Sequence, residues 1–120
     1  MTPFGKLARQ FRRERLMLLG DIAELLGKTP AYISQVETGK KKIPEDFSDQ
    51  VADALVLNEK ERAELRHAAN ISAKQFIVSM PENASERDRE LAHKFAVSFA
   101  RMDSRDKERL RGLMKGTPDE

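Results

Sequence analysis

Residues 20–44 read GDIAELLGKTPAYISQVETGKKKIP, and the spacing of apolar residues, glycines and prolines here predicts a characteristic pair of helices. The apolar residues before Gly27 predict a short helix that ends at this glycine. Thr29 followed by Pro30 predicts the start of a second helix, because threonine is a favoured N-cap and proline is favoured at the first helical position. That helix is expected to end at Gly39. The stretch therefore predicts two short helices joined by a tight turn.

The sequence before this pair predicts one more helix, over residues 3–16. Apolar residues recur there at intervals of three and four, as in an amphipathic helix; they are Phe4, Leu7, Ala8 and Phe11. Gly20 is interpreted as a break or cap after it, and the next helix is expected to use the apolar residues Ile22, Ala23, Leu25 and Leu26.

Two helices are predicted after the pair. Pro44 is interpreted as the beginning of the fourth helix, with an apolar stripe formed by Phe47, Val51, Ala54 and Leu55. Asn58 and Glu61 have the spacing of a capping box, which predicts a fifth helix that runs to about Ala69. Residues 1–70 are therefore expected to form one domain of five short helices.

Residues 71–84 are predicted to form a linker or short strand, because the composition changes there. Phe76, Ile77 and Val78 are contiguous, apolar and β-prone. One interpretation is a short strand near 75–79, which would need another chain or a groove to pair with. The other is an extended linker packed on the helical domain.

Residues 85–116 predict a helical extension. Ser85 begins a capping pattern. Apolar residues then follow at intervals of four, four and three, which predicts one amphipathic helix; they are Leu91, Phe95, Phe99 and Met102. Asp103 restarts the pattern for a last helix that ends before Gly116, and residues 117–120 are expected to be a disordered tail.

Charge is distributed unevenly along the chain. Residues 1–42 carry nine Lys and Arg against four Asp and Glu, residues 43–73 three against seven, and residues 74–120 ten against nine. The net charges are therefore +5, −4 and +1. A basic N-terminal third is typical of a surface that meets a polyanion.

The composition argues against several classes of site. There is no cysteine, and His67 and His93 each lack a second ligand at a metal-binding spacing, so no metal and no cofactor are expected. There is no Gly-rich phosphate loop and no nucleophile elbow, so an enzyme is not expected. No segment approaches the roughly 18 consecutive apolar residues of a membrane span, so we expect a cytoplasmic protein without a membrane partner.

The predicted helix pair matches a known pattern, carried by Ala23, Gly27, Thr29, Tyr32, Ile33, Ser34, Glu37, Gly39, Lys40 and Pro44. This pattern resembles the lambda-repressor and Cro family of helix-turn-helix regulators, over residues 4 to about 70. The resemblance implies a five-helix DNA-binding domain, and with the helical extension predicted from the residue pattern this gives an all-α fold. It also implies that the helix at Thr29–Thr38 is the recognition helix, and that a homodimer binds double-stranded operator DNA.

The resemblance assigns a role to each matching residue. Residues at the base edges would be Thr29, Pro30, Ala31, Ser34 and Gln35. The amide of Gln35 is the most capable of these, because it can pair with adenine through two hydrogen bonds. Tyr32 would face the groove or a phosphate, and Lys40, Lys41 and Lys42 would follow the phosphate backbone.

Two further positions matter for the resemblance. Glu37 occupies a family position that usually pairs with an arginine of the first helix, and Arg12 lies at the matching place, so we expect an ion pair. The family commonly has glutamine at the start of the second helix, where it holds a phosphate. This chain has Leu19 there, and Asp21 nearby would oppose a phosphate.

Two functions agree with these features. The first is a sequence-specific transcriptional regulator, a dimeric repressor of its own or a neighbouring promoter. The second is an antitoxin that binds DNA for autoregulation and a toxin, or another regulator, through its C-terminal segment. In either case the residues expected at the dimer or partner surface are Phe76, Ile77, Val78, Leu91, Phe95, Phe99 and Met102. The alternative for Phe95, Phe99 and Met102 is packing against the fifth or the last helix of the same chain.

Overall fold

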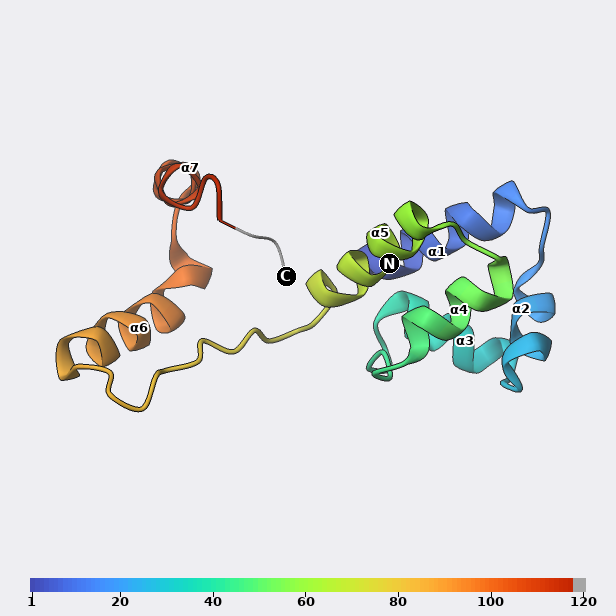
Figure 1. The fold of residues 1–120 in the computed structure, drawn as a ribbon, viewed down its shortest axis with the longest axis horizontal. Helices are drawn as coiled ribbons and strands as arrows, with labels where there is room; N and C mark the ends of the chain where they lie inside the picture. Colours follow the sequence, from blue (N-terminus) through green and yellow to red (C-terminus); the bar gives the residue numbers. More distant parts are fainter. Residues whose placement is uncertain (118–120) are drawn as a thin grey trace. The chain divides into compact units, whose positions relative to one another are not determined.

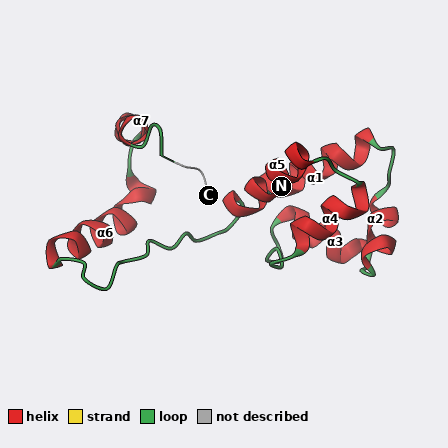
Figure 2. Cartoon of the chain, in the orientation of Figure 1, coloured by secondary structure: helices red, strands yellow, loops and turns green. Residues whose placement is uncertain are grey.

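The computed structural model describes residues 1–117, which form helices, turns and loops and contain no strand (Figure 1 and Figure 2). The all-α fold class predicted from the sequence is confirmed. The chain divides into two units, residues 1–75 and a second unit that begins at Phe76. Of the tail expected over 117–120, residues 118–120 lie outside the described part of the chain.

The first unit is a bundle of five helices (Figure 1). They are α1 (Pro3–Glu14), α2 (Leu19–Leu26), α3 (Pro30–Thr38), α4 (Phe47–Leu55) and α5 (Glu59–Ile71). α1 packs against α5 and α3, α2 packs against α3 and α4, and α4 packs against α5. α1 therefore contacts α3 on one side and α5 on another.

Local capping chemistry sets several helix ends, as the sequence predicts. Thr29 Oγ1 accepts from the backbone N–H of Tyr32 at 3.1 Å and begins α3. Asn58 and Glu61 form the predicted capping box, with reciprocal hydrogen bonds of 2.8 and 3.0 Å. Gly39 ends α3 in the left-handed conformation, with φ of 85°, which an L side chain would adopt only with strain.

The starts of α2 and α4 differ from the prediction. Gly20 is not a break, because α2 begins at Leu19 and includes it. The carboxylate of Asp21 accepts from the backbone N–H of Leu18 at 2.8 Å, which caps the helix ahead of Gly20. Pro44 does not begin α4; its carbonyl accepts from the Phe47 N–H in a turn, and the helix begins at Phe47.

The second unit contains α6 (Glu86–Ser98), the 3-10 helix η1 (Phe99–Arg101) and α7 (Ser104–Leu113). The single α-helix predicted through Met102 is wrong at its end, because α-helical geometry stops at Ser98. The physical reason lies in the next helix. The Asp103 side chain caps α7 by accepting from the Asp106 N–H at 2.8 Å. Met102 and Asp103 have extended backbone at this cap, so the preceding helix cannot continue through Met102.

The strand considered near 75–79 is not present. Residues 75–81 have no regular secondary structure, and no strand is present within the described residues (Figure 2). The β-prone residues Phe76, Ile77 and Val78 do not form a strand on their own, because a strand needs a partner for its N–H and C=O groups.

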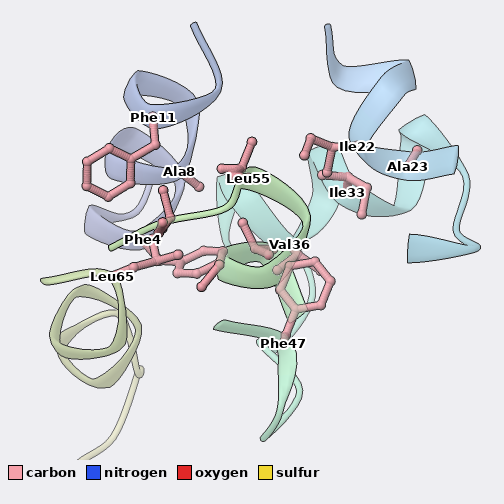
Figure 3. Close-up of a cluster of buried hydrophobic side chains, with 13 residues drawn as sticks. Phe4, Ala8, Phe11, Ile22, Ala23, Ile33, Val36, Phe47, Leu55 and Leu65 are labelled. Carbon is pink, nitrogen blue, oxygen red and sulfur yellow. The ribbon is translucent and has the colours of Figure 1, made fainter. Parts of the chain in front are cut away.

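A single apolar core holds the first unit together (Figure 3). Phe4, Phe47 and Leu65 bring α1, α4 and α5 into the same interior, and the rings of Phe4 and Phe47 lie 5.9 Å apart. Ile33 and Val36 of α3 are fully buried in this core. Burial of one face of α3 leaves its opposite face toward solvent.

Arg15 joins three helices at the end of α1. Its guanidinium donates to the Leu55 carbonyl at 2.7 Å and to the Glu61 carboxylate at 3.0 Å. The pKa of Glu61 lies below its ordinary value, because the carboxylate accepts from the Asn58 N–H and also from Arg15. The end of α1 is thus tied to the α4–α5 corner.

α1 and α3 approach each other closely at Gly5. A Cβ added to this glycine would lie 2.1 Å from the Glu37 carbonyl oxygen. Thr2 completes the contact, because its N–H and its hydroxyl both donate to that same carbonyl, at 3.2 and 2.9 Å. Any larger residue at position 5 would push α3 away from α1.

We expect Gly5→Ala to lower the free energy of unfolding by about 3 kcal/mol, as overpacking against backbone does. Gly20→Ala is the matched control, since a Cβ there meets nothing within 4 Å; it should be neutral or stabilising by up to ~1 kcal/mol. Urea unfolding followed by circular dichroism measures both. Equal effects of the two substitutions would contradict the close approach.

Candidate nucleic-acid interface

α3 presents one face to the core and one to solvent. Ile33 and Val36 are buried, whereas Ala31 and Thr38 are exposed on the other side. The residues predicted to meet base edges are all exposed or partly exposed: Thr29, Pro30, Ala31, Ser34 and Gln35. They lie together on nine residues of helix and its N-cap. This face combines small apolar groups with hydroxyl and amide groups.

Tyr32 is partly exposed and also packs against the core. Its ring lies edge-on to Phe47, with centroids 6.3 Å apart. The ammonium groups of Lys28 and Lys41 lie 5.4 and 5.2 Å from the Tyr32 centroid, within the range of cation–π attraction. Tyr32 thus gathers two positive charges beside α3.

Lys28 is a residue that the sequence analysis did not single out. It lies in the turn between α2 and α3, directly before the Thr29 cap. Its positive charge lies beside Tyr32, as does that of Lys41. Its position in the sequence could have indicated this role, because a cation directly before the Thr29 cap must lie close to the start of α3.

The lysine run after α3 forms an exposed loop. Gly39 turns the chain, and the Lys41 N–H donates to the Gln35 carbonyl at 3.0 Å. This hydrogen bond holds the loop against the end of α3. Lys40, Lys41 and Lys42 are all exposed. The structure therefore brings the predicted lysines and the predicted base-edge residues to one region.

A buried ion pair holds α3 against α1. Arg12 Nη2 lies 3.3 Å from Glu37 Oε1, and the two side chains are only 10% and 7% exposed. This confirms the predicted pair. Burial raises the pKa of Glu37 above its ordinary value, and the positive charges of Arg12 and Arg9 oppose that rise. Together with the Gly5 and Thr2 contacts, the pair fixes the orientation of α3.

The beginning of α2 carries a carboxylate close to its N-cap. Backbone N–H groups at a helix start attract anions, but the Asp21 carboxylate occupies this end by accepting from Leu18 N–H. Leu18 is itself exposed and offers no polar group. The expected difficulty of binding a phosphate here agrees with this geometry.

The family model described as a helix-turn-helix domain matches residues 3–65, more than half of the chain. The match spans the bundle from α1 into α5 and includes both α2 and α3. The chain belongs to this family. It is a family of the Cro and lambda-repressor type. No curated protein and no solved structure matches the chain.

The helix-turn-helix match ends before the extension, so the residues predicted for a dimer or partner surface lie outside it. Phe76, Ile77 and Val78 are exposed. Among the others, Leu91 and Phe99 are exposed, and Phe95 and Met102 are partly exposed. The part of the chain that is described contains no helix able to cross a membrane and no group of three potential metal ligands.

α6 and α7 of this helix-turn-helix protein border an open groove of about 500 Å³. Its apolar lining is Phe95, Phe99, Leu110 and Met114. The rings of Phe95 and Phe99 lie 5.7 Å apart, and the Lys107 ammonium lies 5.1 Å from the Phe99 centroid. None of the residues of α6 and α7 is fully buried.

We expect the Arg12–Glu37 pair to be strongly coupled in a double-mutant cycle. Arg12→Met or Glu37→Met alone should destabilise by about 3 kcal/mol, because each leaves a buried charge without its partner. The double variant should cost clearly less than the sum, because it leaves no buried charge.

The pair of Arg66 and Asp49 is the control, with a similar separation of 3.1 Å but side chains 57% and 55% exposed. Its coupling should stay below about 0.5 kcal/mol. Urea unfolding of both sets gives the coupling energies. Strict additivity of the Arg12 and Glu37 substitutions would refute the structural role of the buried pair.

Proposed function

We propose that this chain is a sequence-specific transcriptional regulator that places α3 in the major groove of operator DNA. Membership of the helix-turn-helix family over residues 3–65 is the observation that carries this proposal. The solvent face of α3 supports it, because the face lies beside the lysines of the loop and the turn.

The side chains of α3 suit the donors and acceptors of the major groove. Gln35 can pair with adenine through N6 and N7, and Ala31 can contact a thymine methyl group. The hydroxyl of Ser34 can donate to or accept from a base. Because so few polar groups are present, we infer that DNA shape contributes to the choice of operator alongside these contacts.

The lysines supply the part of the affinity that does not depend on sequence. Lys40, Lys41 and Lys42 are exposed at the end of α3, and Lys28 lies near its start. Cations at both ends of a helix in the groove can meet phosphates on either side of it. The cation–π contacts with Tyr32 hold two of these side chains near that position.

We further propose that two copies bind a two-fold operator as a repressor of the chain's own or a neighbouring promoter. Dimers of this class read half-sites about one helical turn apart. The open apolar groove between α6 and α7 and the exposed segment at Phe76–Val78 are the surfaces that we assign to the second copy.

An antitoxin is the second candidate function. The observation that favours it is the same exposed segment, since Phe76 is 68% and Ile77 90% exposed. An extended apolar segment of this kind suits binding to another protein by strand addition or in a groove. A chain that stays monomeric at micromolar concentration would favour this candidate over the dimeric repressor.

Selection of duplexes from a random DNA library tests the proposed function. We expect wild-type protein to enrich one motif with two related half-sites. Gln35→Ala should lose preference at one position of each half-site by roughly tenfold or more, because the amide that reads that base is gone. Its affinity for unrelated DNA should stay nearly unchanged.

Gln75→Ala is the matched control, because Gln75 is an exposed glutamine outside the family match. This variant should enrich the wild-type motif. Failure of wild-type protein to enrich any motif would contradict a sequence-specific regulator. An unchanged motif for Gln35→Ala would show instead that another residue reads the bases.

A further inference from the structure

The exposed face of α1 carries a row of three positive charges. Lys6, Arg9 and Arg13 are exposed, on the side of the helix opposite its buried stripe of Phe4 and Phe11. Their spacing of three and four residues places them on one face over two turns. None of the three belongs to an ion pair among residues 1–117. The row therefore presents its charge to solvent.

This row begins beside the lysine loop. A Cβ on Gly39 would lie 2.9 Å from Thr2 Cγ2, so the start of α1 touches the residue before Lys40. Lys6 is one turn along α1, with its N–H donating to the Thr2 carbonyl at 2.9 Å. The start of α1 thus lies beside the residue that precedes the lysine run.

Arg9 is the exposed cation of the row whose charge also acts on Glu37 of α3. Arg12 pairs with Glu37, and the charge of Arg9 also acts on that carboxylate. The nearest acidic residue on α1, Glu14, accepts from Gln10 at 3.0 Å and lies 3.8 Å from Arg15. Glu14 lies on the same surface as Lys6, Arg9 and Arg13, and its carboxylate is engaged by Gln10 and Arg15.

We propose that Lys6, Arg9 and Arg13 contact the phosphate backbone of bound DNA and do the work that the start of α2 cannot do. The Asp21 carboxylate at the start of α2 repels phosphate, whereas α1 offers three exposed cations on a helix whose N-cap residue lies beside Gly39. This inference rests on the proposed DNA binding and adds residues that the helix-turn-helix pattern does not assign.

The salt dependence of DNA affinity tests the proposal directly. Each phosphate contact that is lost should reduce the slope of log affinity against log salt by about 0.9. For the full-length variant Lys6→Gln, Arg9→Gln, Arg13→Gln we expect a slope smaller by roughly 2 to 3 and affinity at least tenfold weaker at ~0.1 M salt. Fluorescence anisotropy of a labelled duplex, selected by wild-type protein or of random sequence, measures both quantities.

The control is Arg87→Gln, Arg89→Gln, Lys94→Gln, which removes the same charge from exposed residues of α6. Its slope should equal that of wild type. Circular dichroism melting checks that both variants fold, as expected for exposed side chains. A single variant, Arg9→Lys, keeps the charge and should keep the slope.

Two results would overturn the inference while leaving the proposed function in place. One is a wild-type slope for the α1 variant, and the other is an equal loss of slope for the α1 and α6 variants, which would reflect net charge alone. Absence of any DNA binding by wild-type protein would overturn both proposals together.

Discussion

The contact between α1 and the end of α3 is the constraint on which the candidate site depends. Gly5 admits the Glu37 carbonyl to a distance that no side chain allows, and Thr2 donates two hydrogen bonds to it. The Arg12 guanidinium also forms a buried ion pair with the carboxylate of Glu37. Backbone and side chain of one residue are therefore held by the same neighbouring helix. This double attachment restrains both the position and the rotation of α3.

The rotation of α3 decides which chemistry faces outward. Successive residues of an α-helix are 100° apart, so a turn by one position would exchange buried and exposed side chains. Ile33 and Val36 fix the inner face through the core, and the Glu37 contacts fix the side toward α1. Ala31 and Gln35 are left outward as a result. Stability and recognition thus use different faces of the same nine residues.

Local chemistry explains which features could be predicted from the sequence. The limits of α3 were predictable because the Thr29 cap and the Gly39 end act within one turn. Gly5 carried no local signal, since its role depends on a carbonyl 32 residues away. The prediction that Gly20 breaks or caps a helix was wrong, because the Asp21 cap outweighs the low helix propensity of glycine. At Phe76 the apolar run indicated a strand as one choice, but a strand depends on a partner that local sequence does not specify.

In the proposed complex, DNA binds the outward face of α3, whose orientation α1 sets. Amide chemical-shift mapping of the ¹⁵N-labelled chain during titration with a selected duplex tests it most directly. We predict that the large shifts fall on Ala31, Ser34 and Gln35 and on the loop at residues 40–42. Shifts confined to residues after Gln75, or spread evenly over the bundle without a maximum at α3, would contradict the claim.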